Sequence, residues 1–240
     1  MKGIFFHEGQ EFQLETIGEV WKQNEVVSGK VHCKGQCPQN LFVVLAFADF
    51  KDVRAKDEKA WDIIEEKKIE GAGTLLSWQI KLAPDAPVTV GSGSLFVLLK
   101  VENKIIGHLQ LTSEIRPMLK SFIETFELFF RFKTHSFKNR KGGFLEYKMM
   151  PPTVREYANM DQVLVALRLK GDQLEAKYSF TLKSLAMVGA GQTELQKKKR
   201  DIEQVLTKKD YEFCEGAHNP EGMKKFIAEA LSSAAPKTLF

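Results

Sequence analysis

Residues 78–117 have the sequence WQIKLAPDAPVTVGSGSLFVLLKVENKIIGHLQLTSEIRP, and this stretch decides the fold. It begins with an alternating strand, turns at the corner 84–87 and turns again at the Gly-Ser-Gly of residues 91–93. A nearly continuous apolar strand follows, and a last strand closes on Arg116-Pro117. Short strands separated by turn residues at this spacing are typical of an antiparallel β-sandwich and disfavour a βαβ arrangement.

Strand patterns continue toward the N-terminus of the chain. Residues 12–17 and 25–33 alternate apolar and polar side chains, and the apolar run 41–47 is typical of a central strand. Residues 49–68 are dense in charge, so we expect an excursion there that ends in a strand near 61–64 and contains no core helix.

The pattern changes after Pro117. Apolar residues at 119, 122, 123 and 126 predict a helix of one or two turns, and alternation then predicts a strand over 127–137. Further strands are expected over 143–150, 161–170 and 173–185. The sequence therefore predicts an all-β protein with one sandwich over 1–117 and a second, immunoglobulin-like sandwich over 118–188. The second unit is short for a sandwich, so either the tail supplies some of its strands or some are missing.

The last fifty residues have a helical period. Gly189-Ala190-Gly191 indicates a break, after which Leu195, Ile202, Val205 and Leu206 form one apolar stripe. Asn219-Pro220 can cap and start a second helix. We therefore predict a helical tail over 189–240. Its apolar faces either pack back onto a sandwich or dock on a partner, and a homodimer formed through the tail is one such arrangement.

Three segments carry a family resemblance: VWKQNEVVSGKV at residues 20–31, WQIKLAPDAP at 78–87 and IRP at 115–117. With them, the chain from about residue 12 to 186 resembles the arrestin-like proteins, in particular the small branch that includes sporulation-control proteins and the arrestin-like subunit of retromer. The resemblance implies two tandem antiparallel β-sandwiches. It also implies a non-enzymatic scaffold or adaptor that binds protein partners at sheet edges and loops.

The distribution of charge along the sequence indicates an alternative function. The net charge is +4, and residues 119–191 hold 12 basic and 7 acidic residues, an excess of +5. Basic side chains interleave with Phe132 and Phe137 at Arg131, Lys133, Lys138, Arg140 and Lys141. These five are the candidate binding residues of a β-sandwich that binds a small anionic ligand or a lipid head group through the basic loop 131–141. A dedicated nucleic-acid binder is more basic than this chain, so we expect no nucleic-acid partner.

Catalytic and metal-binding patterns are weak. His32, Cys33 and Cys37 lie close together, but the Cys-x3-Cys spacing has no second pair, so we predict no metal and a strand-end loop with one buried thiol. Three cysteines, an odd number, argue against a disulfide framework. A hydrolase would need an acid such as Asp85 or Glu114 beside His108. We expect a protein that is not an enzyme and has no cofactor.

Targeting signals are also weak. The first residues have no signal-peptide pattern, and no apolar run approaches the ~18 residues that a membrane-spanning helix needs. The expectation is a cytoplasmic protein, with peripheral attachment to a membrane through a partner as the alternative.

Overall fold

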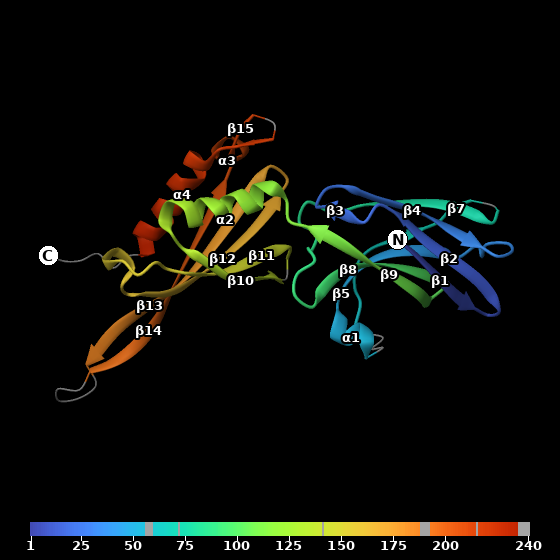
Figure 1. Ribbon diagram of the computed structural model, residues 1–240, viewed down its shortest axis with the longest axis horizontal. Coiled ribbons are helices and arrows are strands. Elements are labelled where there is room, and N and C mark those ends of the chain that lie inside the picture. The colour runs from blue at the N-terminus through green and yellow to red at the C-terminus, as the bar shows by residue number, and fades with distance from the viewer. Residues whose placement is uncertain (56–59, 72, 141, 188–192, 215, 235–240) are drawn as a thin grey trace. The chain divides into compact units, whose positions relative to one another are not determined.

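The computed structural model describes residues 1–55, 60–71, 73–140, 142–187, 193–214 and 216–234, and Figure 1 shows its helices and strands. The chain divides into two compact units, Met1–Ile115 and Arg116–Phe240, each with its own buried core. The fold is mostly β, as the sequence predicted.

The first unit is a sandwich of two sheets. One sheet has the strand order β1-β2-β4-β7, and the other has the order β3-β9-β8-β5-β6. All neighbouring strands are antiparallel except the parallel pair β3 and β9. The strands are β1 (Lys2–His7), β2 (Gln10–Ile17), β3 (Val20–Lys22), β4 (Val26–Cys33), β5 (Leu41–Asp49), β6 (Asp62–Lys68), β7 (Leu75–Lys81), β8 (Gly93–Val101) and β9 (Lys104–Glu114).

The core of this unit explains the period-two pattern. Alternate residues of both sheets, among them Leu14, Val31, Leu45 and Val97, point inward and form one buried apolar cluster. Strands β5 and β8 are apolar on their outer face as well, because Phe96 and its neighbours there pack against the side chains of α1 (Phe50–Arg54) and Trp61. This second cluster accounts for the continuous apolar runs. The predicted strand near 61–64 is confirmed as β6.

The expectation of one buried thiol is wrong. Cys33 and Cys37 form a disulfide with a Cα–Cα distance of 5.5 Å at the end of β4. Gly35 between them has a φ of 113°, a left-handed conformation that only glycine adopts readily and that allows the tight turn. Cys214 is exposed and free.

The second unit contains one five-stranded antiparallel sheet in the sequential order β10-β11-β12-β13-β14. Helices α2 and α4 lie on one face of this sheet (Figure 1), and α2 also packs against α4. Helices therefore form the second layer that a sandwich would build from strands. The elements are α2 (Pro117–Phe130), β10 (Lys133–Arg140), β11 (Phe144–Met150), β12 (Met160–Lys170), β13 (Gln173–Met187), β14 (Thr193–Leu206), α3 (Lys208–Tyr211), β15 (Glu212–Cys214), β16 (Ala217–His218) and α4 (Pro220–Ala234), with a 3-10 turn at Arg155–Tyr157.

The strand predicted to begin at residue 127 is wrong, because α2 continues to Phe130. Phe126 and Phe130 are four residues apart, and their ring centroids are 5.9 Å apart on neighbouring turns of the helix. Arg131 then adopts a left-handed φ of 59°, and its N–H bonds to the Glu127 carbonyl at 3.0 Å. This ends the helix, and β10 begins two residues later.

The helix predicted from Leu195 to Leu206 is also wrong. These residues form β14, which pairs with β13 from Leu174↔Leu206 to Met187↔Thr193. In the strand, Leu206 is buried while Val205 is exposed, so the apolar residues do not share one face. Pairing with the long strand β13 decides this segment, because it satisfies the backbone bonds that a short isolated helix would have to make alone.

The second predicted helix of the tail is confirmed as α4, which begins at Pro220. Its apolar residues Met223, Ile227 and Leu231 are buried inside the second unit, and the Thr125 hydroxyl of α2 donates to Met223 Sδ at 3.8 Å. The tail thus packs back onto its own unit and completes it. A homodimer formed through the tail stays a prediction.

Candidate functional site

The predicted basic site lies on a sheet edge in the second unit. Arg131 ends α2, while Lys133, Lys138 and Arg140 lie on β10, the first strand of the sheet. Lys141 falls outside the described residues. The segment is therefore a strand where the sequence suggested a loop.

The structure brings only part of this cluster together. Lys138 Nζ and Arg140 Nη2 approach the same Glu146 Oε1, at 3.6 and 2.9 Å. The hydrogen bond that Arg140 donates to the Glu146 carboxylate raises the pKa of the Arg140 guanidinium. Lys133 lies at the other end of β10, about 23 Å from Arg140 along the strand at about 3.3 Å per residue. One small anion cannot contact both ends, and binding of an anion at either end stays a prediction.

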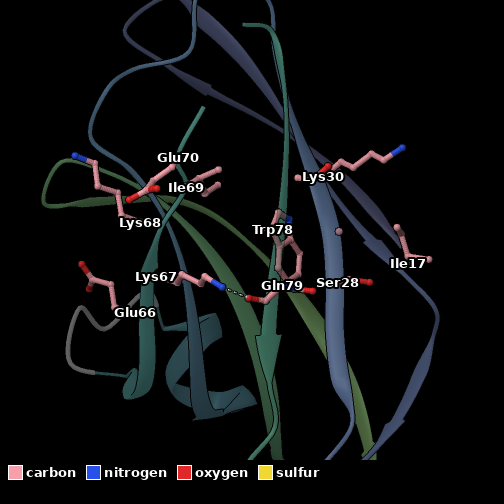
Figure 2. A pocket seen from close by; sticks show the side chains of 12 residues that line it. Ile17, Ser28, Lys30, Glu66, Lys67, Lys68, Ile69, Glu70, Trp78 and Gln79 are labelled. Atoms are coloured by element: carbon pink, nitrogen blue, oxygen red, sulfur yellow. Dashed lines mark hydrogen bonds between the residues drawn. The ribbon is translucent and has the colours of Figure 1, made fainter. Parts of the chain in front are cut away.

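A larger hollow lies in the first unit, between β6 and β7 (Figure 2). Each of these strands is the last of its sheet, so two unpaired sheet edges border the same space. The hollow measures about 810 Å³. We call it the edge groove, and it is lined by Ile17, Ser28, Gly29, Lys30, Glu66, Lys67, Lys68, Ile69, Glu70, Ser77, Trp78 and Gln79.

The backbone of β7 presents hydrogen-bonding groups to this groove. Leu82 donates its N–H to the Glu25 carbonyl at 2.8 Å, so even-numbered positions bond toward β4. Since the bonds of an antiparallel strand alternate in direction, the N–H and C=O groups of Ser77 and Gln79 face the groove. Lys67 confirms this direction, because its Nζ reaches across from β6 and donates to the Gln79 carbonyl at 3.0 Å (Figure 2).

Trp78 lines the inner side of the groove. Its side chain is 6% exposed, and among the described residues its indole Nε1–H has no hydrogen-bond partner. Gly29 makes room for the ring: a Cβ at position 29 would lie 2.5 Å from the indole and would overlap the Glu15 carbonyl oxygen. The groove thus contains a buried donor that an acceptor from outside could satisfy.

Positive charge is in excess along the groove. The charged residues that line it are Lys30, Lys67, Lys68, Glu66 and Glu70. Lys100 Nζ lies 2.9 Å from both carboxylate oxygens of Glu66 and neutralises that group. Of the three lysines, Lys67 crosses the gap to β7, while Lys68 donates to the Asn40 amide oxygen at 3.5 Å and the Lys30 side chain extends away from β7 (Figure 2).

Sequence reasoning missed this groove, although β7 lies inside the stretch that decided the fold. The available signal was the strand Asp62–Lys68, which is exposed along its whole length and carries charges on both faces. Such a strand belongs at a sheet edge. The sequence did not reveal that β7, the last strand of the other sheet, faces this edge.

Other kinds of site have less support. Among the residues described here, no group of three or more His, Cys, Asp or Glu side chains is placed to hold a metal ion. The described helices include none that is long and apolar enough to cross a membrane. The imidazole of His108 packs against the rings of Trp61 and Phe96, with centroids 5.3 and 5.7 Å away, and burial lowers its pKa.

The two units together define an arrestin-like fold. No protein-family model matches the chain, and no curated protein matches it in sequence. Among solved structures it is similar to Spo0M, the sporulation control protein from Bacillus subtilis, with a TM-score of 0.66 and 15% identity. The match covers 94% of this chain and 99% of Spo0M. The similarity confirms the resemblance to small arrestin-like proteins of the sporulation-control type, and at this identity it concerns the fold alone.

Proposed function

We propose that the protein is a non-enzymatic, cytoplasmic scaffold or adaptor that binds a protein partner at the edge groove of its first unit. Arrestin-like folds serve regulation by binding, which supports a role of this kind. The partner contributes an extended segment that pairs with the free edge of β7. This mode of recognition takes its affinity from main-chain hydrogen bonds and its selectivity from the side chains beside them.

One observation carries the proposal: backbone groups of Ser77 and Gln79 face an open hollow beside the unpaired indole N–H of Trp78. Sheet edges in folded proteins are usually protected, because they invite pairing with other chains. Here the protection comes from one lysine side chain, that of Lys67, which bonds to a single carbonyl of the edge. Such a bond is easily exchanged for one to a partner.

The test is affinity capture from native cytoplasm with three immobilised full-length proteins: wild type, Gln79→Pro and Ile4→Pro. Proline at 79 removes an N–H that faces the groove and leaves the bonds to β4 intact. Ile4 lies on β1, the opposite edge of the same sheet, and its N–H also faces away from the neighbouring strand. The two variants therefore carry the same change at two edges.

Capture at stoichiometric levels by wild type and Ile4→Pro, with loss in Gln79→Pro, supports the proposal. If only Ile4→Pro fails to capture the partner, the scaffold function stands and its binding site lies at β1. If all three proteins capture nothing, the scaffold function itself is overturned. Circular dichroism and thermal unfolding confirm that each variant is folded before it is used.

A further inference from the structure

We propose that the edge groove selects an extended peptide that alternates apolar and acidic residues, and that Lys67 moves from the Gln79 carbonyl to a peptide carboxylate as the peptide binds. The inference rests on the proposed function and adds the chemistry of the partner. Three features of the groove point to this ligand.

The first feature is the spacing of the two edges. A strand placed between two others sets them about 9.6 Å apart, twice the usual interstrand distance. The Lys67 side chain bridges β6 and β7 in a single span that ends in a 3.0 Å hydrogen bond. The hollow of about 810 Å³ that borders both edges is the space in which we place the peptide strand.

The second feature is the exchange that the strand requires. An incoming strand that pairs with β7 places one of its N–H groups on the Gln79 carbonyl, which Lys67 Nζ now occupies. The displaced ammonium needs a new acceptor nearby. Because Lys68 and Lys30 also line the groove, a carboxylate on the peptide is the acceptor that best matches the local charge.

The third feature is the contrast between the two faces of β7. On its inner face Leu76, Trp78 and Ile80 are buried, whereas Ser77 and Gln79 on its outer face are exposed. A strand added beside β7 continues both faces, so its inward residues meet apolar side chains and its outward residues meet water and the lysines. A carbonyl of that strand, or an acceptor on one of its side chains, also gives the buried indole N–H of Trp78 a partner.

The test uses nitrogen-15-labelled full-length protein and synthetic peptides, followed by the three indole N–H signals in two-dimensional NMR. The probe is acetyl-TEVEVEVT-amide. Its controls are the glutamine analogue acetyl-TQVQVQVT-amide and the acidic peptide N-methylated at every residue, whose residues keep no main-chain N–H to pair with an edge. Trp78→Phe identifies the Trp78 signal.

We expect the acidic peptide to shift the Trp78 indole signal and the N-methylated peptide to leave it in place. The acidic peptide should bind about tenfold more tightly than the glutamine analogue, a factor that two exposed ion pairs together supply. In the double variant Lys67→Met, Lys68→Met this preference should fall below about threefold, because the lysine stems remain while the charges are lost. Lys104→Met, an exposed lysine on β9, is the matched control and should keep the full preference.

Equal binding of the acidic and glutamine peptides, or an unmoved Trp78 signal, overturns the inference. The capture experiment then separates the two proposals. If capture still depends on Gln79, the scaffold function stands and only the acidic, alternating ligand is wrong. If capture and peptide binding both fail, the proposed function is wrong as well.

Discussion

The two units cover an apolar sheet face by different means. In the first unit a four-stranded sheet is covered by a second sheet, and in the second unit a five-stranded sheet is covered by helices α2 and α4. A sheet cover adds two more strand edges, and in the first unit one of these, β6, borders a hollow with β7. A helical cover adds no edge. The two sheets of the first unit therefore end in four strands, β1, β7, β3 and β6, whereas the five-stranded sheet of the second unit ends in two, β10 and β14.

The sheet edges show the same contrast. In the second unit the outer strands carry lysine and arginine, as at Lys138 and Arg140 on β10 and Lys198 on β14, which discourages pairing with other chains. In the first unit β1 exposes Ile4 and Phe6, and β7 is protected by the bond from Lys67.

Truncation after residue 190 should have the largest effect, because it removes β14 and α4 from the second unit. Buried α4 residues such as Ile227 and Leu231 would no longer cover the sheet. We expect the cooperative unfolding transition of the second unit to disappear while that of the first unit remains, as measured by calorimetry with limited proteolysis. Two intact transitions in the truncated protein would show that the tail is dispensable for the second unit.

A matched pair of core substitutions comes next. Phe126→Ala removes a fully buried ring of α2 whose centroid lies 4.9 Å from that of Phe132. Leu45→Ala removes a buried side chain from the core of the first unit. We expect losses of about 3–5 and 2–5 kcal/mol in the free energy of unfolding, each confined to its own unit. Leu128→Ala on the exposed side of α2 is the control, expected to change stability by less than about 0.5 kcal/mol. A shift of both transitions by either core substitution would contradict two separate cores.

Gly29→Ala should destabilise the first unit by a smaller amount. The added methyl group meets the Trp78 ring and the Glu15 carbonyl, so one of them must move, and overpacking of this kind costs about 1–3 kcal/mol. Chemical denaturation measures the loss, with Ser28→Ala next to it as the control. An unchanged midpoint for Gly29→Ala would mean that the indole is not held against Gly29.

The smallest expected effect concerns Asp161 in the second unit. Hydrogen bonds from Lys197 Nζ (2.6 Å) and Lys183 Nζ (3.1 Å) hold the pKa of its carboxyl below the usual range. A lowered folded-state pKa adds stability above the unfolded-state pKa, and this stability is lost as the pH falls through the folded-state value. Lys197→Met should raise the Asp161 pKa in a carbon-13 NMR titration. No change would contradict the strand register that places Lys197 on β14 beside Lys183 on β13.

Local patterns predicted most of the first unit, because period-two alternation and turn residues there agree with the final strands. The same reasoning failed for the segment around Leu195. This segment is a strand because it pairs with β13, and its own side-chain spacing does not reveal that pairing. The candidate site was missed for a related reason. Trp78 lay in the decisive stretch, but its importance depends on β7 being the last strand of one sheet and facing the last strand of the other.

The position of β14 and α4 near the C-terminus also sets an order of events during synthesis on the ribosome. Every strand of the first unit is available once residue 115 has emerged, so that sandwich can fold while translation continues. The second unit lacks its fifth strand and one of its covering helices until residues 193–234 follow. At about 5–20 residues per second, its sheet waits roughly 6–24 s longer than the first. During that interval the apolar face of β10 to β13 is the part of the nascent chain that most needs a chaperone.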